Sequence, residues 1–246
     1  MCTVTFVPTS DGFYFTSSRD ERVSRRTIPP VRYSENGRSL IYPKDEKAGG
    51  TWIASDSKGK TACLLNGAFV NHKKEYNYVK SRGLILLESF EYKDISEFSD
   101  KTNLDGVEPF TLLILDYSNG ALQYFNEFRW DGQNKYLKSL SQVDTQIWSS
   151  ATLYSKPIQD IRLSLFENWI KKHEQFEDKM ILDFHNRKHG LDSTNDILMQ
   201  GYKDLRTLSI SQIHLKNDNA FFKYVDLIRN KTSLIKLDQT EYANAF

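Results

Sequence analysis

The chain has 246 residues and a mass of 28.6 kDa, which is enough for one large domain or two small ones with a packed core. Charged residues make up 26% and hydrophobic residues 39%, and this balance excludes a wholly disordered chain. The 33 Lys and Arg residues are balanced by 32 Asp and Glu residues. A formal net charge of +1 therefore gives no electrostatic reason to expect a nucleic acid or an anionic membrane as partner.

The start of the chain carries no targeting pattern. Residues 1–8 have neither the basic segment nor the long apolar segment of a secretory signal. No stretch approaches the roughly 20 apolar residues that a membrane helix needs. The two cysteines, Cys2 and Cys63, are too few for a disulfide scaffold or a four-thiolate zinc site. We therefore expect a cytoplasmic protein that does not insert into membranes.

A hairpin pattern opens the chain. Apolar and polar residues alternate over 2–7, which predicts a strand that begins at Cys2. The turn Ser10-Asp11-Gly12 joins it to a second strand over 13–16, which the charged residues 19–22 close.

The next segment contrasts an irregular region with a clear hairpin. Residues 27–50 contain Pro29-Pro30 and Gly49-Gly50 and predict a long, partly ordered loop. Residues 51–66 predict two strands around a polar turn, and the polar segment after them predicts a further loop.

The middle of the chain combines helical segments with a third hairpin. Residues 83–88 favour the start of a helix over a strand, and residues 94–101 are helical in character. Residues 110–127 predict a hairpin about Ser118-Asn119-Gly120, the strongest turn signal in the chain. A short strand is expected over 146–151.

The C-terminal third begins with an amphipathic helix from Pro157 to about His173. Proline suits the first turn, and apolar residues recur near helical spacing at Ile158, Ile161, Leu165, Trp169 and Ile170. Further helices are expected over 176–185 and 194–198, and closing strands over 208–213, 221–228 and 233–237.

The order of these elements predicts the fold class. Hairpins come first, helices follow, and strands close the chain, without the regular alternation of a doubly wound α/β sheet. An α+β fold of two mainly antiparallel sheets with helices packed outside accounts better for this order. No internal repeat or linker divides the chain, so we expect a single domain over residues 1–246.

Cys2 is the most informative candidate for chemistry. Removal of Met1, which a small second residue permits, would place a thiol and a free α-amine on Cys2. An α-amine has a pKa of about 7.7 to 8.0 and can act as a base, and a thiol beside a base is an activated nucleophile. The alternative is an inert cysteine buried in a strand.

Three more polar residues are candidates that each have an ordinary explanation. Arg19 could hold a carboxylate or lower the pKa of a thiol, and Asp20 could orient an amine; otherwise both belong to a solvated charge cluster. Asn66, at the end of an apolar strand, could donate to an oxyanion or simply begin a turn with Gly67.

Two histidines have the spacing of a metal or haem ligand pair. His185 and His189 would share a face if both lay on one helix. No third ligand of matching spacing accompanies them, and His189-Gly190 is typical of a helix end, which favours a structural role.

These signals together form a pattern that resembles a known family. The chain starts Met-Cys, continues with Ser18-Arg19-Asp20-Glu21 and Gly49-Gly50-Thr51-Trp52-Ile53, and reaches Leu65-Asn66 at a strand end. It resembles the NRDE family, that of transport and Golgi organisation protein 2, whose members carry Asn-Arg-Asp-Glu and Gly-Gly-Thr-Trp. Ser81-Arg82-Gly83-Leu84 and the segment 148–153 also look like family motifs. The first 90 residues match well and the last third poorly.

The resemblance implies an N-terminal nucleophile (Ntn) hydrolase with a four-layer α-β-β-α sandwich. Cys2, Arg19, Asp20 and Asn66 are similar in order and setting to the catalytic set of the cysteine Ntn acylases, such as bile salt hydrolase and penicillin V acylase. By this likeness Cys2 attacks an amide or ester carbonyl while its α-amine carries the proton. Asn66 steadies the oxyanion, Asp20 orients the amine, and Arg19 holds the thiolate or the substrate.

The chain departs from the family pattern at three places. The first Asn of Asn-Arg-Asp-Glu is Ser18, and the Asn of a Ser-Asn-Ala segment is Ser150. A late Thr-Arg-Ser motif is represented at best by Arg206-Thr207, so Ser150 and Arg206 are the weakest site candidates. Serine offers one donor with a shorter reach, which affects activity more than fold.

Two functions remain open at this point. The first is a hydrolase of an amide or ester bond in a small molecule, without a cofactor. The second is a non-enzymatic protein of haem or acyl-ligand binding and trafficking on the same fold, because members of the family have been connected with haem handling and lipid metabolism. A free amino terminus at Cys2 separates them, since only the hydrolase needs it.

Overall fold

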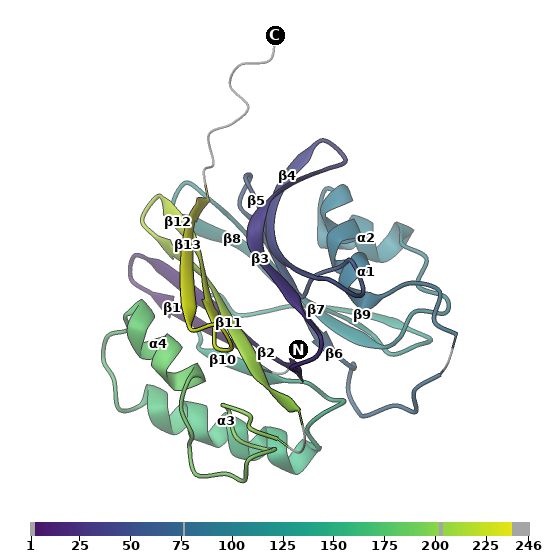
Figure 1. The fold of residues 1–246 in the computed structure, drawn as a ribbon. Coiled ribbons are helices and arrows are strands. Elements are labelled where there is room, and N and C mark those ends of the chain that lie inside the picture. Colours follow the sequence, from purple (N-terminus) through teal and green to yellow (C-terminus); the bar gives the residue numbers. More distant parts are fainter. Residues whose placement is uncertain (1–2, 76, 202–203, 238–246) are drawn as a thin grey trace.

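Two antiparallel β-sheets packed face to face form the centre of the protein, and helices cover the outer face of each (Figure 1). The structure, a computed structural model, describes residues 3–75, 77–201 and 204–237. One apolar cluster fills the space between the sheets, a second lies between one sheet and its helices, and a third lies between the other sheet and its helices. The predicted four-layer α-β-β-α sandwich is therefore confirmed.

The first sheet combines strands from the N-terminal and C-terminal parts of the chain. Its strands, in spatial order, are β10 (Gln146–Ser149), β1 (Thr3–Thr9), β2 (Gly12–Arg22), β11 (Leu205–Lys216), β12 (Asn219–Asp226) and β13 (Lys231–Leu237). β1 lies between β10 and β2, so that Thr3 pairs with Ser149 on one side and with Ser18 on the other. The start of β1 is thus held within the sheet on both sides.

The second sheet runs in chain order. Its strands are β3 (Thr27–Glu35), β4 (Arg38–Asp45), β5 (Ile53–Asp56), β6 (Lys60–Asn66), β7 (Phe110–Ser118), β8 (Ala121–Trp130) and β9 (Lys135–Ser139). The expected hairpins over 51–66 and 110–127 are present as β5–β6 and β7–β8. The edge strand β9 was not expected. Four of its five residues are exposed, so its sequence lacks the apolar alternation that predicts a strand.

The prediction of a loop over residues 27–50 is wrong. β3 and β4 form a hairpin whose turn is Asn36-Gly37, with φ of 48° and 76°. Asparagine and glycine adopt this left-handed conformation at low cost, and the pair is a strong hairpin signal. The two prolines after Ile28 fall at a bulge of the edge strand, where a missing N–H donor breaks no ladder hydrogen bond.

Helices α1 (Arg82–Glu88) and α2 (Ile95–Lys101), with the short 3₁₀ turn η1 (Ser89–Glu91) between them, cover the second sheet. Helices α3 (Lys156–Ile170) and α4 (Asp178–His185) cover the first. The helix expected over 194–198 is absent, because that segment turns around the carboxylate of Asp196, which accepts the backbone N–H groups of residues 189–191 and 197. None of the described helices combines the length and apolar character needed to cross a membrane.

The buried face of α3 differs from the predicted stripe. Its buried residues are Arg162, Phe166 and Trp169, whereas Ile161 is 42% exposed. Trp169 is buried as predicted and the other predicted residues are half-buried, so the difference lies at Ile161, where the neighbouring Arg162 takes the inward position. This arginine bears directly on the site described below.

Two of the family-like motifs meet through their glycines. A Cβ atom on Gly50 would lie 2.5 Å from the backbone carbon of Gly83, and one on Gly83 would lie 2.7 Å from the carbonyl oxygen of Thr51. The Thr51 N–H donates to the Gly83 oxygen at 3.3 Å. Only glycine permits this approach, which fixes the start of α1 against the segment that leads to Trp52.

Candidate active site

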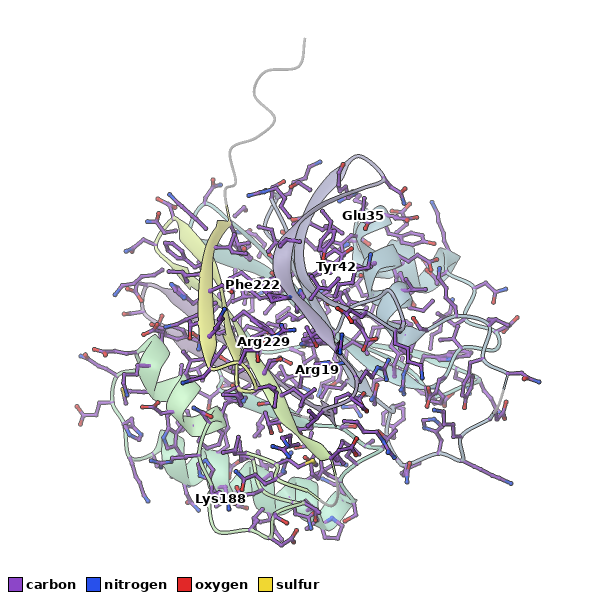
Figure 2. The ribbon with its side chains drawn as sticks, viewed as in Figure 1. Arg19, Glu35, Tyr42, Lys188, Phe222 and Arg229 are labelled. Atoms are coloured by element: carbon purple, nitrogen blue, oxygen red, sulfur yellow. The ribbon has the colours of Figure 1, made fainter. Side chains whose placement is uncertain are left out.

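Arg19 is buried between the two sheets (Figure 2), not solvated at a strand end. β2 extends to Arg22, so the residues expected to close the strand lie within it. The Arg19 guanidinium donates to Asp45 Oδ2 at 2.7 Å and lies 4.6 Å from the centre of the Trp52 ring. Burial lowers the pKa of Arg19, although Asp45 opposes the shift. Arg19 therefore stands as a fixed cation between an acid and an aromatic ring.

Asp45 links two arginines and was not expected from the sequence. Its carboxylate receives Arg19 and also Arg25, whose Nε lies 2.7 Å from Oδ2. Burial alone would raise the pKa of Asp45, but the backbone N–H of Ala48 and the guanidinium groups of Arg25 and Arg19 outweigh it and lower the pKa. The residue falls in the segment interpreted as a loop, which removed any reason to place it near Arg19.

Arg19 and Asn66 line the same cavity. Its volume is about 220 Å³. It lies between the ends of β2, β4 and β6 and the start of α1, and its lining includes Arg19, Glu21, Asp45, Trp52, Asn66, Ser81, Arg82 and Glu108. Two residues that the sequence places on different hairpins thus meet at one concave site.

Two polar groups of the residues that line this cavity lack a hydrogen-bond partner in the described part of the chain. Arg82 pairs with Glu108 at 3.1 Å, and burial lowers the pKa of Arg82 against the effect of that acid. Trp52 is 4% exposed, and its indole Nε1 has no hydrogen-bond acceptor among the described residues. The buried hydroxyl of Ser81 likewise has no partner within the described part of the chain. A ligand that carries acceptor oxygens would satisfy these groups.

Ser150 positions Asn66 through the backbone. Its hydroxyl donates to the Asn66 carbonyl oxygen at 2.9 Å and lies 3.0 Å from the Thr152 hydroxyl. The next residue, Gly67, has a φ of 81° and packs against Ala151 and Thr152. The Ser150 hydroxyl is therefore occupied by the end of β6, and Asn66 itself is among the residues that line the cavity.

Asp20 lies on the opposite face of β2 from Arg19, because successive side chains of a strand alternate. Its buried carboxylate accepts from the Tyr154 hydroxyl at 3.0 Å and from the Thr207 hydroxyl at 2.6 Å. Asp20 is thus held by Tyr154, just before α3, and by Thr207 of β11. It does not line the cavity.

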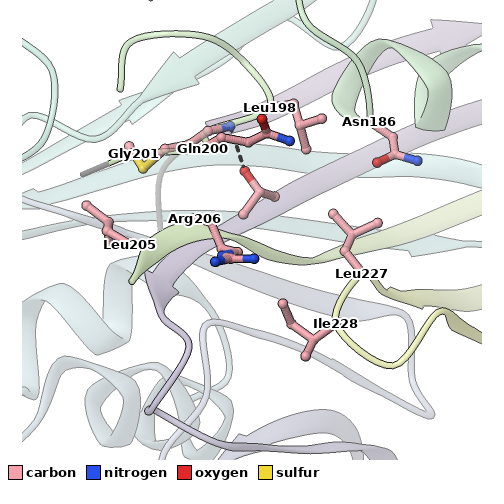
Figure 3. Close-up of a pocket in the computed structure, with 10 residues that line it drawn as sticks. Asn186, Leu198, Gln200, Gly201, Leu205, Arg206, Leu227 and Ile228 are labelled. Carbon is pink, nitrogen blue, oxygen red and sulfur yellow. Dashed lines mark hydrogen bonds between the residues drawn. The ribbon is translucent and has the colours of Figure 1, made fainter. Parts of the chain in front are cut away.

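Arg206 does not join Arg19 and Asn66. It is exposed and lines a separate pocket of about 460 Å³ with Leu227 and Ile228 (Figure 3). Thr207, its neighbour, is the residue that reaches Asp20. Side chains alternate along a strand, so Arg206 and Thr207 point to opposite faces of the sheet. Only Thr207 is on the face of the Asp20 carboxylate.

Arg162 fixes the first described residue of β1. Its side chain is fully buried and donates to the Thr3 hydroxyl at 2.9 Å and to the Ser149 hydroxyl at 3.2 Å. The guanidinium also lies 3.6 Å from the centre of the Tyr154 ring, whose hydroxyl holds Asp20. Arg162 was not among the predicted site residues, although its spacing of four positions from Ile158 and from Phe166 is that of one helix face.

The histidine pair does not have the geometry of a metal site. α4 ends at His185, so His189 lies beyond the helix. The ring nitrogens of His185 are hydrogen-bonded to the hydroxyls of Thr5 and Ser18, each at 2.8 Å. Burial, then electrostatic repulsion from His189 and Arg162, lowers the pKa of His185 to about 3. His185 is a neutral bridge between β1 and β2.

The two cysteines differ in what the structure says of them. Cys2 lies outside the described residues, and the nearest described residue is Thr3. Cys63 is fully buried in β6, and burial raises the pKa of its thiol to about 12. A thiol with so high a pKa carries almost no thiolate at neutral pH, so Cys63 is a structural residue.

Comparison with known proteins agrees with this fold. A family model described as transport and Golgi organisation 2 matches residues 1–235. No curated protein sequence matches the chain. A solved structure described as a Caenorhabditis elegans N-acylethanolamine-hydrolyzing acid amidase ortholog superposes with a TM-score of 0.57 and 11% identity, over 86% of this chain and 92% of that one.

Two further structures are conjugated bile acid hydrolase from Clostridium perfringens. A variant with a cysteine replaced by alanine gives a TM-score of 0.57 and 9% identity, over 97% of this chain and 94% of that one. A variant with an arginine replaced by leucine gives 0.56 and 11%, over 96% and 94%. At such identities the likeness establishes the shared fold, which is that of the Ntn hydrolases.

Proposed function

The chain belongs to the transport and Golgi organisation 2 family, and from this membership and its Ntn-hydrolase fold we propose that it is an N-terminal-cysteine hydrolase of an amide or ester bond. The observation that carries the proposal is the shared cavity of Arg19 and Asn66. Thr3, to which Cys2 is bonded, pairs with Ser18, the residue before Arg19. The proposed nucleophile therefore directly precedes Thr3, whose partner on β2 is the residue before Arg19.

The proposed reaction uses one residue as nucleophile and base. After Met1 is removed, the α-amine of Cys2 takes the thiol proton, and the thiolate attacks the substrate carbonyl carbon. The side-chain amide of Asn66 donates to the oxyanion of the tetrahedral intermediate. When the intermediate collapses, the ammonium returns its proton to the leaving amine or alcohol. Water, deprotonated by the same amine, then hydrolyses the thioester and releases the acid.

The surrounding residues have separate tasks in this proposal. Arg19, immobilised by Asp45 and Trp52, supplies a fixed positive charge that favours the thiolate. Asp20, oriented by Tyr154 and Thr207, stabilises the ammonium form that appears during the attack. The roles are electrostatic, and both side chains are already held in place without substrate.

The cavity restricts what the substrate presents to it. Its volume of about 220 Å³ is below the roughly 300–1,000 Å³ of pockets that enclose a drug-sized ligand, so only part of a substrate fits inside. The unpartnered donors of Trp52 and Ser81 favour a polar group with acceptor oxygens there. The remainder of the substrate would extend out of the cavity.

Hydrolysis assays on defined variants test the proposal. A panel of N-acyl amides and acyl thioesters is incubated with wild-type protein, with Cys2→Ser, with protein that retains Met1 and with Cys63→Ala as the matched cysteine control. Turnover should fall by orders of magnitude in the first two variants, because serine is far harder to ionise and a peptide bond removes the base. Cys63→Ala should retain it.

The carrier function is the other outcome of the same experiment. Haem and fatty acyl ligands are titrated into the same proteins. Hydrolysis absent in every protein, together with ligand affinity that is unchanged by Cys2→Ser and by retained Met1, would replace the hydrolase with a carrier. Hydrolysis that persists in Cys2→Ser would show that another residue is the nucleophile.

A further inference from the structure

Two buried polar groups of the cavity that holds Arg19 and Asn66 await a hydrogen-bond partner within the described part of the chain. They are the indole Nε1 of Trp52, a residue that is only 4% exposed, and the hydroxyl of Ser81. The indole groups of Trp130 and Trp148 differ, because they donate to a backbone carbonyl oxygen and to a glutamate carboxylate, each at 2.9 Å. Folded proteins rarely leave buried donors unpaired, so we expect a bound group to complete those of Trp52 and Ser81.

The acidic side chains that line the same cavity already have donors. Three acids line it: Glu21, Asp45 and Glu108. Asp45 Oδ1 accepts two backbone N–H groups, and its Oδ2 receives two guanidinium groups. The oxygens of Glu21 face a backbone N–H and Arg25. Those of Glu108 face His72 and Arg82. A ligand group that donates hydrogen bonds would have to share these oxygens with donors that are already in place.

The charges of the lining favour an anion. Four basic residues accompany the three acids: Arg19, Arg25, Lys74 and Arg82. Each of the three arginines pairs with one of these acids, whereas Lys74 has no ion pair among the described residues. Four cations against three anions leave an excess of one positive charge. The side chains of Arg19 and Arg82 are only 4% and 16% exposed, and poorly hydrated cations attract an anion more strongly than cations at the surface.

We infer that this cavity is a carboxylate subsite, in which Trp52 Nε1 and the Ser81 hydroxyl donate to an acid group of the ligand and Arg82 balances its charge. A carboxylate offers only acceptors, and acceptors are what the two unpaired donors lack. The inference rests on the proposed function, because it names the substrate class of the hydrolase: an amide or ester that also carries a free acid group. The acid group occupies the cavity, and the remainder of the substrate extends out of it.

Acetate, which is small enough for a cavity of about 220 Å³, probes the subsite directly. Protein with isotope-labelled tryptophan is titrated at constant ionic strength with acetate and, separately, with the neutral analogue acetamide, and the indole N–H signals are followed by NMR. The signal that is missing from Trp52→Phe identifies Trp52. Acetate should shift this signal in a saturable manner and bind at least about tenfold more tightly than acetamide, because hydrogen bonds to charged groups are the stronger ones. The Trp130 and Trp148 signals should stay in place.

Variants assign the contribution of each residue. Arg82→Gln removes the charge and should weaken acetate binding by at least about tenfold, and Ser81→Ala should weaken it by a smaller factor. Arg82→Lys keeps the charge and should retain the preference for acetate over acetamide. Arg187→Gln removes an exposed arginine outside the cavity and should change nothing. Because the Ser81 hydroxyl does not cap α1, Ser81→Ala is a mild change that tests the subsite even if Arg82→Gln fails to fold.

Matched substrates separate this inference from the hydrolase proposal. N-hexanoylglycine carries an acid on the amine side and the monoanilide of succinic acid carries one on the acyl side, and each is compared with its carboxamide. One acid substrate should exceed its neutral analogue in kcat/KM by at least about tenfold, and Arg82→Gln should remove this preference.

The outcomes of the two experiments are distinct. Saturable acetate binding without hydrolysis of any substrate would keep the subsite and refute the hydrolase. Hydrolysis with equal turnover of acid and neutral substrates in both pairs would overturn the inferred substrate class. A Trp52 signal that acetate does not move, or acetamide that binds as tightly as acetate, would overturn the carboxylate subsite, whether or not hydrolysis is found.

Discussion

His185 makes the stability of the protein sensitive to mild acid. Its folded-state pKa is lowered from 6.5 to about 3, first by burial and then by electrostatic repulsion from His189 and Arg162. As the pH falls below 6.5, the unfolded chain takes up a proton at this residue and the folded chain does not. Stability is therefore complete above pH 6.5 and is lost progressively down to about pH 3.

The size of the loss follows from this difference in pKa. At pH 5, proton uptake at His185 stabilises the unfolded state by RT ln(1 + 10^1.5). The free energy of unfolding is therefore about 2 kcal/mol lower than at neutral pH. This is a sizeable fraction of the roughly 5–15 kcal/mol that stabilises a typical domain. Because the ring holds Thr5 of β1 to Ser18 of β2, acid should also loosen the strand that follows the proposed nucleophile in the chain.

Urea denaturation at pH 7 and pH 5 measures the effect. The wild-type free energy of unfolding should fall by about 2 kcal/mol more between these two pH values than that of His185→Gln, which cannot titrate. The comparison cancels the contributions of His189 and His214, whose pKa values burial also lowers. His173→Gln, just beyond the end of α3, tests whether loss of any histidine gives the same result. Equal pH dependence in wild type and His185→Gln would refute the reasoning.

The remaining predictions concern the buried ion pair, the glycine contact and the structural thiol. Asp45→Ala leaves the buried Arg19 unpaired and should destabilise the fold by about 3–5 kcal/mol in urea titrations, whereas Asp204→Ala, in an exposed pair, should cost less than about 1 kcal/mol. Gly83→Ala places a Cβ 2.7 Å from a carbonyl oxygen and should lower the melting temperature by several degrees; an unchanged melting temperature would contradict the close contact. Cys63, with a thiol pKa of about 12, should react with a thiol reagent only after unfolding, and labelling of the folded protein at Cys63 would show that it is not sealed in the core.

Local patterns were sufficient to predict three of the hairpins and two antiparallel sheets with helices outside them. Apolar alternation and turn signals such as Ser118-Asn119-Gly120 involve residues only a few positions apart. They can therefore be recognised in the sequence alone. The Ntn-hydrolase fold itself was implied only by the resemblance of the motifs around Arg19, Trp52 and Asn66 to a known family. The same local reasoning failed over residues 27–50, where two prolines suggested a loop and concealed an edge strand with an Asn-Gly turn.

The partners of the candidate residues were decided only in three dimensions. Asp45 was assigned to a loop, yet sheet packing brings it to Arg19. The register of β11 against β2 sends Thr207, and not Arg206, to Asp20. Arg162 reaches Thr3 across 159 positions of the chain. A residue type and its spacing show what chemistry a side chain can perform, but contacts between distant segments depend on strand register and on which face of each element is buried, and these are set when the layers pack together.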